Sequence, residues 1–156
     1  KKATMAIPKI ISELARTFPD VTVSGWNTPG SVTLSGPTAD IEGVEANLQS
    51  NTQIKVTRLT VSGAFHSTQM DTVQEPFLSA IAGMEFRPPR IPIISTLSGN
   101  KVDATAPMDA AYWTRQIREA VDFKTATNTL AENNIRCVME IGPRPILSPW
   151  LHKLND

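Results

Sequence analysis

The alternation of apolar runs and helical repeats in the first sixty residues constrains the fold more than any other feature of this chain. Apolar residues at helical spacing follow Pro8, which suits the first turn of a helix, and recur after Pro37. Alternating apolar and polar residues, interrupted by the turn at 27–30, are typical of half-buried strands. The expected elements are strands at 3–7, 21–23, 31–35 and 54–59 and helices at 8–18 and 38–48. Their order, βαββαβ, predicts a ferredoxin-like unit.

The remainder of the chain is more helical. Ser67 or Thr68 can cap a helix whose apolar stripe extends to Ile81. The other expected elements are strands at 91–95 and 135–141 and helices at 109–118 and 121–132. Cys137 lies in the last apolar run, where we expect it to be a small buried hydrophobe. The sequence predicts a mixed α/β (α+β) chain with a small subdomain at 1–61 and a second segment at 62–156.

Charge and composition argue against two kinds of partner. The chain has 156 residues, with 15 basic and 15 acidic side chains and no net charge, so nucleic acid is not an expected partner. An RNA-binding ferredoxin-like module would also need exposed aromatic residues patterned for base stacking. No apolar stretch of about 18 residues predicts a membrane span. The single cysteine fits a reducing cytoplasm, and because the chain begins Lys1-Lys2 we expect it to be cut from a longer polypeptide.

His66 is the strongest candidate for chemistry. It stands in Ala64-Phe65-His66-Ser67, between an apolar run and the start of a helical pattern, where a side chain can be rigid and still face a cleft. Histidine titrates near neutral pH, so it can accept a proton as a general base and return it as an acid. The alternative is a hydrogen-bonded structural histidine at the end of a strand.

Four segments in a fixed order carry a resemblance to a known family. They are Ala64-Phe65-His66-Ser67 and the stretches 27–36, 112–123 and 140–147. Together they resemble the acyltransferase domains of type I polyketide and fatty acid synthases and the free-standing malonyl-CoA:acyl-carrier-protein transacylases. The resemblance implies that the βαββαβ unit is the family's small lobe. It also implies that residues 62–156 are the C-terminal part of the large α/β hydrolase-like lobe.

The family's nucleophile is absent from this sequence. Family enzymes form an acyl-enzyme on the serine of a Gly-His-Ser-x-Gly turn, and no serine here has glycine two residues before and two after it. The resemblance therefore implies the C-terminal half of an acyltransferase domain, which carries the base without the nucleophile. By itself such a chain is expected to be inactive.

The resemblance also implies roles for individual residues. His66 would serve as general base, with its second ring N–H held by the backbone carbonyl of Gln116. Phe65 would lie beside the α-carbon of the substrate and favour malonyl, although Gly63 departs from the histidine or tyrosine that the family has there. Asn27 would lie close to the cleft between the lobes. The alternatives are an exposed glutamine, a core aromatic and a turn-forming asparagine; no metal or bound cofactor is expected.

The expected function is thus part of an acyltransferase that moves a malonyl-type unit from CoA to the phosphopantetheine thiol of an acyl carrier protein. Its expected partners are the carrier protein, malonyl-CoA as substrate, the N-terminal half of the same domain and neighbouring synthase domains. The alternative is a non-catalytic remnant that docks a carrier protein or a trans-acting partner. The sequence upstream of Lys1 would separate the two, because only the enzyme needs a Gly-His-Ser-x-Gly there.

Overall fold

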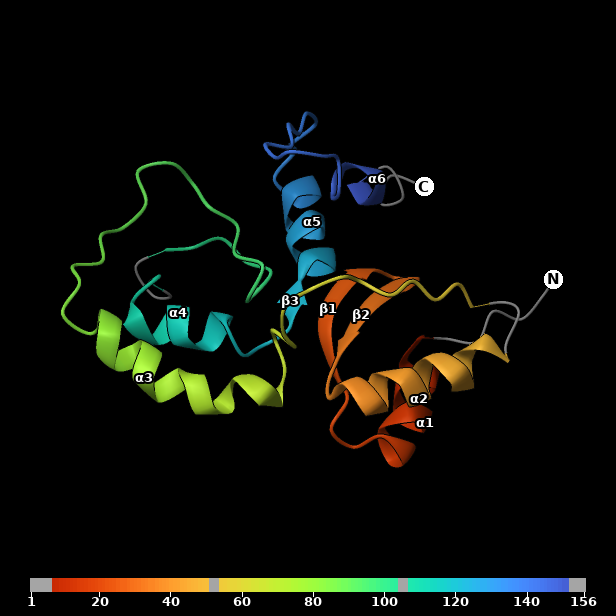
Figure 1. The fold of residues 1–156 in the computed structure, drawn as a ribbon. Coiled ribbons are helices and arrows are strands. Elements are labelled where there is room, and N and C mark those ends of the chain that lie inside the picture. The colour runs from red at the N-terminus through yellow and green to blue at the C-terminus, as the bar shows by residue number, and fades with distance from the viewer. Residues whose placement is uncertain (1–6, 51–53, 104–106, 152–156) are drawn as a thin grey trace.

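The computed structural model describes residues 7–50, 54–103 and 107–151. Its elements are α1 (Ile7–Thr17), β1 (Thr22–Thr28), β2 (Ser31–Ser35), α2 (Thr38–Gln49), the 3₁₀ helix η1 (Thr68–Met70), α3 (Asp71–Ile81), α4 (Ala110–Gln116), β3 (Val121–Asp122), α5 (Phe123–Glu132) and α6 (Ser148–Leu151). Figure 1 shows α1 and α2 beside the β1–β2 hairpin, with α3 and α4 paired on the far side of β3. The chain contains both helices and a small sheet, which confirms the mixed α/β class.

A small core forms where α1 and α2 pack against the hairpin. Its buried centre is Ile10, Leu14 and Val44, because these residues fall on the inward faces of the two helices. Gly43 permits this packing, since a Cβ atom there would lie 2.5 Å from the ring of Phe18. The partly buried residues around this centre are Ile7, Phe18, Val21, Leu34, Leu48 and Ile54.

The sheet joins the N-terminal hairpin to a short strand from much later in the chain. β1 and β2 pair antiparallel up to Thr28 and Ser31, on either side of a two-residue turn. β3 then pairs parallel with the other edge of β1, where Gly25 lies opposite Val121, to give the order β2-β1-β3. This parallel pairing fixes the position of the loop before β3 relative to β1.

The structure confirms part of the predicted βαββαβ order and corrects the rest. The helices predicted at 8–18 and 38–48 are α1 and α2, and the hairpin strands are β1 and β2. The strand predicted at 3–7 lies outside the described residues except for Ile7, which begins α1. The strand predicted at 54–59 is wrong: these residues are irregular. A strand needs a partner edge, and among the described residues the segment 54–59 pairs with none of β1, β2 and β3.

In the segment after residue 61, the structure again confirms the predicted helices but not the predicted strands. Asp109 and Asp122 cap α4 and α5 with hydrogen bonds of 2.8 and 2.9 Å to Tyr112 N and Thr125 N, so both helices start where a capping residue stands. The strands predicted at 91–95 and 135–141 are wrong. The first segment forms only an isolated bridge, and the second is irregular with an exposed Cys137. An apolar strand of this kind is buried only when neighbouring strands and helices cover it.

Candidate functional site

Hydrogen bonds of the buried Ser67 side chain fix the turn that carries His66. The Ser67 side chain is 0% exposed; its Oγ donates to the carbonyl of Ala64 at 2.6 Å and accepts from Gln69 N at 3.2 Å, so Ser67 is the predicted cap, here of η1. These bonds close the turn over His66, whose φ of 58° lies in the left-handed region. A non-glycine residue is held there at a cost of roughly 1–3 kcal/mol, so the surrounding contacts determine its conformation.

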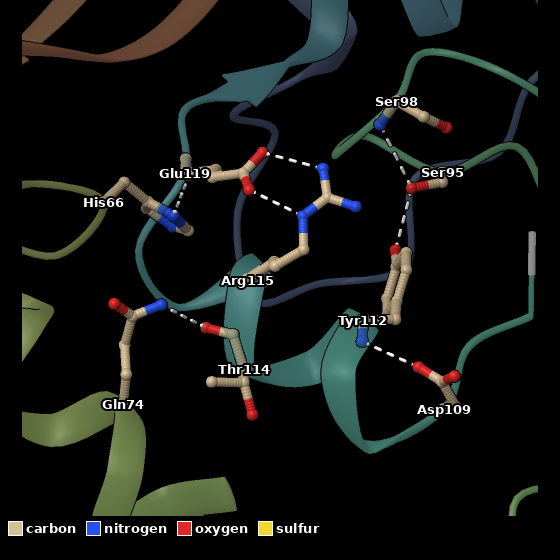
Figure 2. A network of polar contacts seen from close by, with 9 residues as sticks. All are labelled: His66, Gln74, Ser95, Ser98, Asp109, Tyr112, Thr114, Arg115 and Glu119. Atoms are coloured by element: carbon tan, nitrogen blue, oxygen red, sulfur yellow. Dashed lines mark hydrogen bonds and ion pairs between the residues drawn. The ribbon is translucent and has the colours of Figure 1, made fainter.

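The loop between α4 and β3 holds the histidine on its other side. His66 N donates to the carbonyl of Ile117 at 3.2 Å, and His66 Nδ1 lies 2.9 Å from the carbonyl oxygen of Glu119 (Figure 2). A carbonyl oxygen can only accept, so the hydrogen bond requires the proton on Nδ1. In the neutral ring Nε2 is then left with a lone pair, and the half-buried imidazole can take a proton there.

The carbonyl that faces His66 belongs to Glu119 and not to Gln116, which corrects the prediction from resemblance. α4 ends at Gln116, and the N–H groups of Arg118 and Glu119 turn back to the carbonyl of Arg115 at 3.0 and 2.8 Å. This tight turn carries the chain round, so the acceptor comes from three residues further along.

Charged side chains fasten the same loop. Arg115 contacts both carboxylate oxygens of Glu119, at 2.6 Å from Nε and 3.0 Å from Nη2, and this pairing lowers the pKa of Glu119. Arg118 pairs with Asp71, the first residue of α3. Gln74 adds a 3.4 Å hydrogen bond to the carbonyl of Thr114 on α4. Sequence reasoning missed the first two pairs, although the i,i+4 spacing of Arg115 and Glu119 was a detectable signal.

Phe65 and Gly63, which stand just before His66 in the sequence, lie next to each other. Phe65 is 51% exposed, so its ring is not part of the core of this chain. A Cβ atom at Gly63 would lie 3.9 and 4.0 Å from two ring carbons of Phe65, which is ordinary van der Waals contact. The two positions therefore form one surface beside the histidine turn.

Asn27 takes a different place from the one predicted. It lies inside β1 and not in the turn, with 6% of its surface exposed. Its Nδ2 donates to Thr33 Oγ1 on β2 at 3.0 Å. Within the described ranges no hydrogen bond links Asn27 to His66 or Phe65.

Glu140 is a second feature that the sequence reasoning did not single out. Its carboxylate accepts hydrogen bonds from the backbone N–H groups of Ile146, Leu147 and Ser148 at 2.8–2.9 Å and from the Ser148 hydroxyl. These donors lower the pKa of Glu140 to about 2. The residue closes a loop onto the start of α6 and lies apart from the His66 turn in the sequence.

Two negative findings apply to the described part of the chain. It holds no group of three or more His, Cys, Asp or Glu side chains placed to bind a metal ion. Among the helices of residues 7–50, 54–103 and 107–151, none is long and apolar enough to cross a membrane.

Comparison with known proteins decides the family. The acyl transferase domain model matches residues 2–154. The chain belongs to the acyl transferase domain family. Polyketide synthase GfsB of Streptomyces halstedii is 32% identical over 144 residues, which are 92% of this chain and 3% of that protein. The non-reducing polyketide synthase pks27 of Aspergillus flavus is 38% identical over 133 residues, 83% of this chain and 6% of that protein. The chain thus spans a small fraction of these relatives.

Solved structures agree with the family assignment. The acyltransferase domain from the second module of the salinomycin polyketide synthase superposes with a TM-score of 0.85 at 32% identity, over 96% of this chain and 34% of that one. The malonyl-CoA:acyl carrier protein transacylase of Xanthomonas oryzae gives a TM-score of 0.85 at 21% identity, over 97% of this chain and 49% of that one. At that identity the second match shows the fold alone.

Proposed function

We propose that this chain is the C-terminal part of an acyltransferase that transfers a malonyl-type unit from CoA to the phosphopantetheine thiol of an acyl carrier protein. The observation that carries the proposal is the hydrogen bond between His66 Nδ1 and the carbonyl of Glu119, because it leaves Nε2 as the proton acceptor. Membership of the acyl transferase domain family supports the reaction class.

In the proposed mechanism, a serine from the rest of the domain attacks the malonyl thioester while His66 Nε2 takes the proton of its hydroxyl. The tetrahedral intermediate collapses with cleavage of the C–S bond, and the protonated Nε2 returns the proton to the departing CoA thiol. The carrier protein's thiol then attacks the acyl-enzyme, with its proton passing through the same nitrogen to the serine. No redox step or bound cofactor is needed, because CoA enters only as part of the substrate.

The exposed ring of Phe65 supports a role in substrate selection. It lies one residue before the base and beside Gly63, which supports placing it next to the substrate. We propose that Phe65 fills the space that an α-methyl group would need, which favours malonyl over methylmalonyl. For Asn27 we propose a structural role in the hairpin, because its amide bonds across to β2.

Substitution of His66 tests the proposal in the complete domain. His66→Ala should slow formation of the malonyl-enzyme by about a hundredfold or more, since a positioned general base contributes on that scale. Single-turnover loading followed by intact-protein mass spectrometry gives the rate. His152→Ala, which removes the only other histidine of this chain, is the matched control and should load at the normal rate.

Loading of malonyl by the His66→Ala domain at the wild-type rate would make His66 a structural residue. A second measurement uses the 156-residue chain alone, which should form no covalent malonyl adduct because it lacks the nucleophile. A stoichiometric, hydroxylamine-sensitive adduct on this chain would contradict the assignment of the nucleophile to another segment.

A further inference from the structure

The loop between α4 and β3 determines where the imidazole of His66 lies. Its carbonyls at Ile117 and Glu119 accept from the backbone N–H and the ring Nδ1 of His66, respectively. The direction of the Glu119 carbonyl therefore sets both the ring orientation and the nitrogen that carries the proton. The contacts that hold this loop in place therefore also affect the position of His66.

One residue, Arg115, restrains Glu119 at two separate points. The Arg115 carbonyl accepts the Glu119 N–H at 2.8 Å, and the Arg115 guanidinium holds the Glu119 carboxylate through Nε at 2.6 Å and Nη2 at 3.0 Å. The remaining polar group of Glu119 is its carbonyl, and that group faces His66. Figure 2 shows the arrangement, with Arg115 on one side of Glu119 and His66 on the other.

We propose that Arg115 is a positioning residue for the general base: its two-point hold on Glu119 directs the carbonyl that fixes His66 with the proton on Nδ1. The inference rests on the proposed function of His66. The pair is exposed, with 59% of the Arg115 and 43% of the Glu119 side chain accessible, so its contribution to the stability of the whole fold is small. A small displacement of a catalytic group, by contrast, changes the rate.

The planar guanidinium matters for this role. A bidentate pair fixes the carboxylate in two directions, whereas lysine offers a single point charge on a flexible stem. Arg115→Lys should therefore restore only part of what Arg115→Gln removes.

A spectroscopic test reports on the ring without requiring activity. The ¹⁵N shifts of a neutral imidazole distinguish the Nδ1–H from the Nε2–H tautomer, and a His152→Gln background leaves His66 as the one histidine of the 156-residue chain. We expect His66 to be in the Nδ1–H form, and Arg115→Gln to shift it towards a mixture with the Nε2–H form. The matched control is Arg87→Gln, since Arg87 forms a similar exposed pair with Glu85 at 3.0 and 2.9 Å elsewhere in the chain.

Kinetics of the complete domain supply the second readout. Arg115→Gln should lower kcat/KM for malonyl loading about twofold to fivefold, the range open to one exposed ion pair. Arg87→Gln should leave it unchanged. The charge swap Arg115→Glu with Glu119→Arg should load faster than Arg115→Glu alone, because it rebuilds a pair at the same two positions. Thermal unfolding of each variant shows whether its fold is kept.

The proposal is overturned if Arg115→Gln keeps the Nδ1–H tautomer and loads like Arg87→Gln, or if the charge swap recovers nothing while folding normally. These outcomes differ from failure of the proposed function. In that case His66→Ala would load normally, while the tautomer shift in Arg115→Gln would still show that Arg115 positions the ring.

Discussion

Three consecutive residues in the histidine turn have three different environments. Phe65 is 51% exposed, His66 is half-buried and Ser67 is fully buried. The left-handed conformation at His66 separates their directions, so the chain can anchor itself through Ser67 while it presents Phe65 outward. A substitution at Phe65 should therefore leave the anchoring hydrogen bonds of Ser67 intact.

Phe65→Ser in the complete domain should raise methylmalonyl loading relative to malonyl. Room for one methyl group is worth roughly 1–3 kcal/mol, or about tenfold to two-hundredfold in kcat/KM, and the missing side chain at Gly63 favours the lower end. A competition assay with both CoA thioesters at equal concentration measures the ratio.

Gly63→Ala is the matched control for this assay. It adds one Cβ at contact distance from the Phe65 ring, so it should keep the malonyl preference. An unchanged product ratio in active Phe65→Ser would instead locate the selectivity outside this surface.

At the scale of single elements, α6 depends on a residue that precedes it by eight positions. A helix of four residues is too short to be stable by itself, and its first N–H groups need acceptors. The Glu140 carboxylate accepts the N–H of Ser148, the first residue of α6, and those of Ile146 and Leu147 just before it. The charge on Glu140 therefore holds the loop 140–148 closed.

Acid should open this loop. The hydrogen bonds lower the pKa of Glu140 from 4.5 to about 2, so the stabilisation is fully present above about pH 4.5 and is lost as the pH falls through 2. The amide signals of Ile146, Leu147 and Ser148 should shift together over this interval in a ¹H–¹⁵N titration.

Glu140→Gln should remove that titration and leave the three amides weakly held at every pH. Glu132→Gln, which removes a carboxylate outside the loop, should leave it unchanged. If the amides kept their acid transition in Glu140→Gln, another group would be responsible for closure.

For the whole molecule, the main feature is apolar surface without a cover. The segment 135–141 was expected to be a buried strand, yet Met139 and Ile141 are 83% and 93% exposed and Cys137 is exposed as well. The chain aligns with 34% of the salinomycin acyltransferase chain. A run of exposed apolar residues such as this one is typical of a surface that another part of a protein covers. We infer that the rest of the domain covers it.

The thiol of Cys137 can report on that cover. It should react quickly with a thiol reagent such as Ellman's reagent in the 156-residue chain and about tenfold or more slowly in the complete domain, because burial blocks access. Lys9→Cys in a Cys137→Ser background places a thiol at an exposed position of α1. This thiol should react at the same rate in both proteins. Equal rates for Cys137 in the two contexts would mean that this segment stays uncovered.

The sequence by itself determined those features that depend on neighbouring residues. Periodicity located α1, α2 and the β1–β2 hairpin, and Ser67 caps its helix through bonds within two or three positions. The four motifs also predicted the family, which the match over residues 2–154 confirms. The division at residue 61 and the roles of His66 and Phe65 stay predictions.

Only the tertiary structure decided which distant groups meet. β3 pairs with β1, about a hundred positions away, whereas the predicted strand at 54–59 is irregular. The same pairing fixes the loop that presents Glu119, and not Gln116, to His66. Strand pairing and burial depend on what else is available to cover a segment, which is a property of the assembled molecule. For this reason, local patterns identified the histidine but could not identify the carbonyl that holds it.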